Sequence, residues 1–134
     1  MATTFTNVTR QYRDLDLNFN IHPVRKDINK TVGDMAVINS IKNLISTNNY
    51  ERLFNPELGC NLKRYLFEPI DNITTNNIIE EITKTIVNYE TRVQLLDVTA
   101  NPDYDKNGYD VSIKFIIRND PQPITITFFL ERVR

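Results

Sequence analysis

The sequence predicts an α+β domain in which two long helices and a short helical turn pack on an antiparallel sheet that ends in a C-terminal meander. Two stretches, 35–47 and 71–89, repeat apolar residues three or four positions apart, as one face of a helix does. The stretches after residue 92 instead alternate apolar and polar residues, as half-buried strands do. At 134 residues the chain is expected to form a single domain over 14–134.

Composition excludes several classes of protein. Hydrophobic residues are 40% and charged residues 25% of the chain, an ordinary globular balance. No apolar run approaches the roughly 20 residues of a membrane helix, and no signal peptide is evident, so we expect the protein to stay in the cytoplasm. The net charge of −1 gives no overall attraction to nucleic acid. The single Cys60 excludes an internal disulfide and is expected to be a small buried thiol.

The N-terminal part is predicted to contain a tail and one strand. Residues 1–13 are polar, Thr-rich and aperiodic, which indicates a flexible tail or one ordered by a partner. Residues 14–21 alternate strictly, which predicts a half-buried strand ended by His22-Pro23. Residues 24–32 are expected to form a loop or a short extended return. The strand would face inward through Leu15, Leu17, Phe19 and Ile21.

The first long helix is predicted from about Met35 to Thr47. Asp34 is a residue type that favours the N-cap position. The helix-weak Asn48-Asn49 pair is expected to end the helix. Its inward face would consist of Val37, Ile38, Ile41, Leu44 and Ile45.

Residues 50–70 are the densest mixture of apolar, turn and charged residues in the chain. We expect a wedge of core that contains a tight turn at 55–59, with Gly59 at a positive φ. Asn61 is then expected to cap a short helix, which Pro69 stops. The apolar residues of the wedge are Phe54, Leu58, Leu62, Tyr65, Leu66, Phe67 and Ile70.

The second long helix and the sheet follow. Asp71 or Thr74 can cap a helix that ends near Tyr89. A strand then begins at Val93, and its alternation requires a bulge at 96–97. The inward residues of the helix would be Ile78, Ile79, Ile82, Ile86 and Tyr89.

The last forty residues are predicted to form two further strands, 109–117 and 124–133. Asn107-Gly108 between two alternating runs is a strong hairpin signal. The spacing of 103–108 also resembles the first half of a calcium loop, but Lys114 stands where a bidentate Glu is needed, so the hairpin is favoured. The final strand is β-branched and close to the terminus, which predicts an exposed edge suited to strand addition.

Catalytic residues are scarce. Three scattered glycines form no phosphate loop, and one histidine excludes histidine-based acid–base pairs and histidine-rich metal sites. We therefore expect no cofactor and no metal. Glu57, Glu68 and Glu90 could supply the two carboxyl groups of glycoside hydrolysis, but each also has a structural role in a turn, before a proline or beside Arg92. The sequence favours a protein that is not an enzyme; the alternative is a peptidoglycan-degrading, lysozyme-like hydrolase.

Four motifs carry a resemblance to a known family. In order and spacing they resemble the baseplate wedge and sheath-initiator family of contractile phage tails, which includes the equivalent type VI secretion subunit. Two positions depart from the family pattern: Tyr50 replaces a Gly, and Glu90-Thr91-Arg92 replaces Glu-Pro-Arg. Some members carry a lysozyme label. The motifs are SIKNLIST at 40–47, ERLFNPELGC at 51–60, LFEP at 66–69 and NYETRV at 88–93.

The resemblance implies a late viral structural protein located in the tail baseplate of the virion and assembled in the host cytoplasm. Its implied partners are other baseplate wedge proteins, the tail sheath protein and proteins near the tail tube, with no nucleic acid and no membrane. Glu90 and Arg92 match the motif that contacts the helical bundle of the wedge. The alternative is an internal Glu90–Arg92 or Glu90–Arg64 pair. The final strand would template sheath by strand addition, through Ile124, Ile126, Phe128, Leu130 and Arg132.

Overall fold

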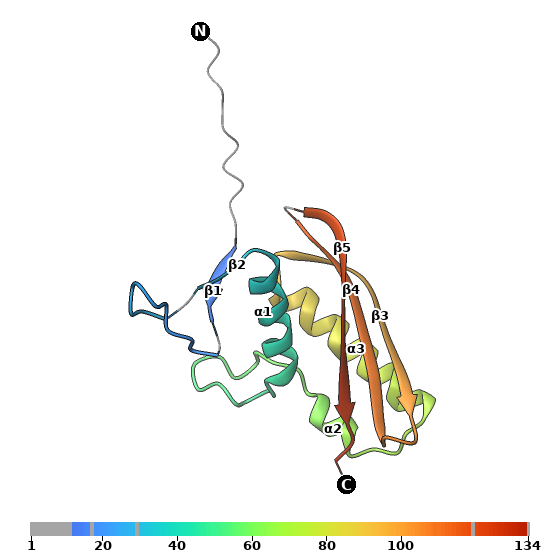
Figure 1. Cartoon of the computed structure of the whole chain (residues 1–134). Helices are drawn as coiled ribbons and strands as arrows, with labels where there is room; N and C mark the ends of the chain where they lie inside the picture. The colour runs from blue at the N-terminus through green and yellow to red at the C-terminus, as the bar shows by residue number, and fades with distance from the viewer. Residues whose placement is uncertain (1–11, 17, 29, 119, 134) are drawn as a thin grey trace.

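A computed structural model describes residues 12–16, 18–28, 30–118 and 120–133. Its centre is a three-stranded antiparallel sheet in the order β3-β4-β5 (Figure 1). The strands are consecutive in the chain, so the predicted meander and the predicted α+β class are both confirmed. The bounds are Val93–Asp103 for β3, Gly108–Ile117 for β4 and Asp120–Glu131 for β5.

Three helices cover one face of this sheet: α1 (Asp34–Ser46), α2 (Leu62–Leu66) and α3 (Asn72–Tyr89). Alternate residues of β4 point toward the helices and are buried, whereas those between them are more exposed. The apolar faces of α1 and α3 meet this row in one core. The fully buried members of that core include Val37, Ile41, Ile78, Ile82, Ile86, Val111, Ile113 and Phe115.

The two long helices begin differently. The carboxylate of Asp71 accepts a hydrogen bond from the Thr74 amide at 2.6 Å, so Asp71 is the N-cap of α3, as one of the two predicted residues. The predicted cap of α1 was wrong. Asp34 is the first helical residue, and the N-cap is Gly33 at φ 74°, with no side-chain cap bond. Gly33 makes this sharp entry without strain because it has no Cβ.

The strand predicted over 14–21 is mostly absent. Only β1 (Arg13–Leu15) is extended, and it pairs with β2 (Lys30–Val32). The Asp16 carboxylate accepts a bond from the Asn18 amide at 3.1 Å, and Phe19 adopts φ 52°, so local turn chemistry breaks the strand. Leu15, Phe19 and Ile21, expected inward, are exposed. Leu17 and residues 1–11 lie outside the described residues, whereas Tyr12 packs against the core.

The predicted wedge is only partly core. Leu62 and Leu66 of α2 are buried together with Cys60, but Phe54 is wholly exposed and Phe67 mostly so. The main chain of 47–60 closes on itself through Tyr50 N–H to Pro56 C=O (2.7 Å) and Cys60 N–H to Thr47 C=O (2.8 Å). These bonds set the path of the loop, and its tip projects the Phe54 ring into solvent.

Gly59 and the β3–β4 connection follow the sequence expectations. Gly59 adopts φ 135°, and a Cβ there would lie 2.6 Å from the Thr47 carbonyl oxygen. The register of β3 shifts between Leu95 and Asp97, which confirms the bulge. The hairpin into β4 turns through Asn107 at φ 53°.

In the described part of the chain, every helix is too short or too polar to cross a bilayer.

Candidate functional site

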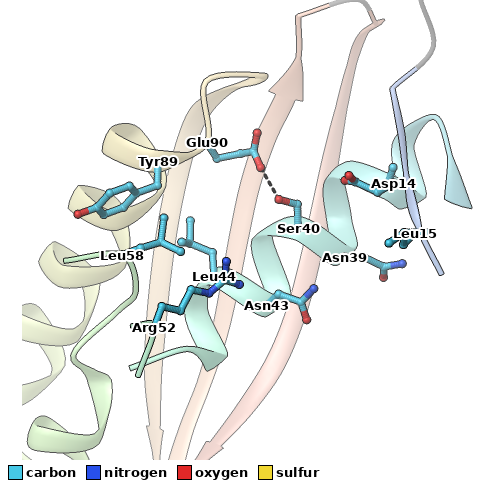
Figure 2. Close-up of a pocket in the computed structure, with 11 residues that line it drawn as sticks. Asp14, Leu15, Asn39, Ser40, Asn43, Leu44, Arg52, Leu58, Tyr89 and Glu90 are labelled. Atoms are coloured by element: carbon cyan, nitrogen blue, oxygen red, sulfur yellow. Dashed lines mark hydrogen bonds between the residues drawn. The ribbon is translucent and has the colours of Figure 1, made fainter. Parts of the chain in front are cut away.

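Glu90 and Arg92 form a charged corner where α3 gives way to β3. The Glu90 side chain is 5% exposed and receives two bonds from one guanidinium: Arg92 Nε donates to Oε1 at 2.7 Å and Nη2 to Oε2 at 2.8 Å. The Ser40 hydroxyl of α1 donates to Oε2 at 2.7 Å (Figure 2). This paired geometry is the stronger form of a charge-assisted hydrogen bond.

Arg92 also reaches the N-terminal hairpin. Its Nη1 donates to Asp14 Oδ2 of β1 at 3.2 Å, and its guanidinium lies 5.5 Å from the centroid of the Tyr12 ring. The corner therefore joins three parts of the chain that are distant in sequence: β1, α1 and the connection from α3 to β3. The Arg92 side chain keeps 24% of its surface exposed and Asp14 keeps 45%, so the outer side of the corner faces solvent.

The corner keeps both groups charged. Burial acts to raise the pKa of Glu90, but the bonds from Arg92 and Ser40 and the positive charge of Arg92 outweigh it, so the pKa lies below its ordinary value. The hydrogen bond to Glu90 is the main cause that raises the pKa of Arg92 further. Glu90 is thus a permanent carboxylate at neutral pH.

The structure brings the predicted pair Glu90 and Arg92 into direct contact with each other. This is the internal pairing that the sequence offered as an alternative to a partner contact. Arg64, the other candidate for the pair, is exposed on α2 and takes no part in the ion pairs of the described residues. The available part of the corner is therefore the outer side of Arg92, beside Asp14.

A groove of about 530 Å³ adjoins this corner. Ser40 and Glu90 lie at one side, and Arg52 extends from the 47–60 loop toward Leu44 and Asn43 (Figure 2). The groove mixes amide, hydroxyl, charged and apolar groups, as the surface of a protein contact does.

The three carboxylates considered for hydrolysis lie in separate segments: the 47–60 loop, the turn after α2 and the corner after α3. Glu57 is exposed in the loop, and Glu68 accepts a bond from the Thr74 hydroxyl at 3.4 Å. The Glu90 carboxylate is held in an ion pair with Arg92. A glycosidase acid needs a raised pKa, whereas the pKa of Glu90 is lowered. No cluster of three or more metal-ligating side chains occurs among the described residues.

Four of the five predicted residues of the final strand face inward, and the fifth, Arg132, directly follows β5. Ile126 is buried, while Ile124, Phe128 and Leu130 are partly buried against the core. Arg132 donates its amide to Asn107 of the β4 side at 3.0 Å. The residues between them face away from the core and are exposed; they were not among the predicted partner-binding residues, although the alternation of β5 carries the signal. They are Thr125, Thr127, Phe129 and Glu131.

Comparisons with known proteins agree on one family. The family model described as baseplate wedge protein gp25 matches residues 32–122. The baseplate wedge protein gp25 of Enterobacteria phage T4 is 31% identical over 118 residues, which cover 88% of this chain and 89% of the relative.

Solved structures share the fold. A chain of the anti-feeding prophage baseplate is 20% identical with a TM-score of 0.64, and the match covers 92% of this chain and 88% of that one. A protein of Geobacter sulfurreducens that carries the name tail lysozyme is 22% identical with a TM-score of 0.70, covering 75% of this chain and 92% of that one. At these identities the likeness concerns the fold alone.

Proposed function

The chain belongs to the gp25 baseplate wedge family, and on that premise we propose that it docks on helices of other wedge proteins and offers the free edge of β5 to the tail sheath. As a member of this family it is a structural baseplate wedge protein of a contractile tail, located in the tail baseplate, and it is not an enzyme. Other baseplate proteins are its partners. Wedge docking would fix its position, and sheath would then polymerise only on a finished baseplate.

The docking part of the proposal rests on the outer side of the charged corner. Glu90 holds Arg92 in one orientation, and Asp14 of the N-terminal hairpin accepts a further hydrogen bond from the same guanidinium. A guanidinium fixed in this way can bind a carboxylate or the C-terminal carbonyls of a partner helix with little further loss of freedom. The adjoining groove supplies the apolar contact that such a helix would need.

The single observation that supports strand addition is the position of β5. It is an edge strand, bonded to β4 on one side. Extended peptides add to such edges through main-chain hydrogen bonds, which supply affinity, while alternating side chains supply specificity. A baseplate protein that exposes such an edge can seed the first ring of a strand-exchanging sheath.

Incorporation of variants into baseplates tests the docking step. The tagged full chain should co-purify with wedge proteins and sheath protein of the same tail. Arg92→Ala should weaken wedge binding by about 2–5 kcal/mol, because a buried interfacial charge would lose its partner. Arg64→Ala is the matched control, since it removes an exposed guanidinium that takes no part in the ion pairs of the described residues and does not line the groove, and it should dock normally. Normal incorporation of the folded Arg92→Ala protein would sink the docking proposal.

A further inference from the structure

The direction of the main-chain groups along β5 can be assigned. The Arg132 amide donates to the Asn107 carbonyl at 3.0 Å, and an unbroken register runs from there to the pair of Pro123 with Ile116. In an antiparallel ladder, bonded pairs alternate with pairs whose N–H and C=O groups point away from each other. Even-numbered residues of β5 from Ile124 onward therefore bond to β4. The groups that point to the free edge belong to Thr125, Thr127, Phe129 and Glu131.

This free edge is closed at both ends. Pro123 has the same parity as the edge residues and has no N–H, so the edge offers no donor there. At the other end, the Val133 amide donates to the Leu66 carbonyl of α2 at 3.2 Å. Prolines are tolerated in edge strands where the missing donor would face solvent, as at Pro123. The open edge is thus a window of about seven residues, 125–131.

A groove of about 340 Å³ lies beside this window. One wall is formed by Lys42, Ile45 and Ser46 of α1, and the other by residues 127–130 of β5. A strand added to β5 would turn alternate side chains toward the helices, because side chains alternate across a sheet. Those side chains would meet Ile45 and Phe128, which are apolar, and the cation of Lys42.

We propose that the window and this groove together bind an extended segment of about seven residues from another tail protein, with apolar inward side chains and one inward carboxylate opposite Lys42. This inference rests on the proposed strand addition and adds the length, the register and the chemistry of the partner strand. A second copy of this chain fits less well. The inward positions of its own window, Ile126, Phe128 and Leu130, are all apolar, so that segment would bring no carboxylate to Lys42.

Two synthetic peptides test the groove. Both are seven residues of alternating valine and threonine, one with a glutamate and one with a lysine at the central inward position. Titrated into the full chain, the glutamate peptide should shift the NMR amide signals of Thr125, Thr127, Phe129 and Glu131. It should bind about threefold more tightly than the lysine peptide, as an exposed ion pair allows. Lys42→Glu should reverse this preference, and Lys84→Glu on the exposed side of α3 should leave it unchanged.

Closing the edge tests the window. Thr127→Pro removes an edge donor but no bond to β4, so the fold should persist while peptide binding falls at least tenfold. Thr127→Val keeps the donor and should bind normally. Peptides that bind Thr127→Pro as they bind the native chain would overturn the edge and strand addition with it.

The remaining outcomes separate the groove from the function. Equal binding of both peptides to the native chain would overturn only the preference for an acidic residue. Strand addition itself would then be tested by whether baseplates that contain this chain recruit sheath protein. Failure of both peptides to shift the four amides would overturn the window. If sedimentation shows that the chain self-associates and that the peptides compete with this association, the strand that occupies the edge comes from a second copy of this chain. That result would overturn the proposed partner.

Discussion

Arg92→Ala should lower the free energy of unfolding by about 2–3 kcal/mol at pH 7. Removing one partner of a buried ion pair costs about 3–5 kcal/mol, because the other charge remains buried without compensation. Arg92 is 24% exposed, so water reaches the vacated side of Glu90 and reduces this figure. The Ser40 hydroxyl stays in place and satisfies part of the carboxylate.

Acid should reduce the difference between the two proteins. In the native chain the pKa of Glu90 is lowered, because the bonds from Arg92 and Ser40 outweigh the opposing effect of burial. A carboxyl group whose pKa is lowered by folding stabilises the folded protein at pH values above its pKa in the unfolded chain, which is about 4.3 for Glu. This stabilisation is lost as the pH falls through the pKa of the group in the folded protein. Without Arg92, burial dominates and the pKa rises, so protonation favours the folded variant. The destabilisation should therefore shrink as pH falls from 7 toward 4.

Urea denaturation followed by circular dichroism measures both effects, because the chain has no Trp to serve as a fluorescent probe. Arg64→Ala is the matched control, since Arg64 is exposed on α2; it should change stability by less than about 0.5 kcal/mol. Arg92→Lys keeps the charge but loses the paired geometry and should fall between the two. A loss at pH 7 no larger than that of Arg64→Ala, or one that grows in acid, would refute the reasoning.

Two further substitutions or modifications follow from the 47–60 loop. Gly59→Ala should destabilise the protein by at least about 2 kcal/mol, because φ is 135° and the new Cβ would press on Thr47. Gly33→Ala, with φ 74° but open space, should cost less in the same thermal melts, and an equal cost would contradict the steric argument. Burial raises the pKa of Cys60 to about 11, so a thiol reagent at pH 8 should react only at the rate of opening. Immediate reaction of the folded protein would show that the thiol is accessible.

The helices and the meander were predictable because their patterns extend over ten or more residues and most apolar positions fall on one buried face. Tyr89, expected on the inward face of α3, is an exception at 37% exposed. The 14–21 alternation failed because it competes with the Asp16 turn and the positive φ of Phe19, which an apolar pattern does not encode. The prediction that Phe54 belongs to the core was wrong for another reason. Apolar composition shows which side chains can be buried, whereas the backbone closure of the loop decides where they point.

Only the contact between neighbouring residues of the candidate site could be predicted from the sequence. Glu90 and Arg92 are two positions apart at a corner, so their pairing could be anticipated. Ser40 and Asp14 come from segments 50 and 78 residues away from their partners, and one sequence carries no signal for such contacts. The edge residues of β5 needed the direction of one bond, Arg132 to Asn107, which fixes the parity of the strand from Pro123 to Glu131.

The attachment of β5 has a mechanical consequence. Along its length the strand is laddered to β4, and its end is tied to α2 by the bond from Val133 to Leu66. A force directed along β5 loads all ladder bonds in shear, so they must break together. A force that lifts the Val133 end meets one bond first and then peels the ladder pair by pair. The domain should resist tension along β5 far better than peeling from its C-terminal end.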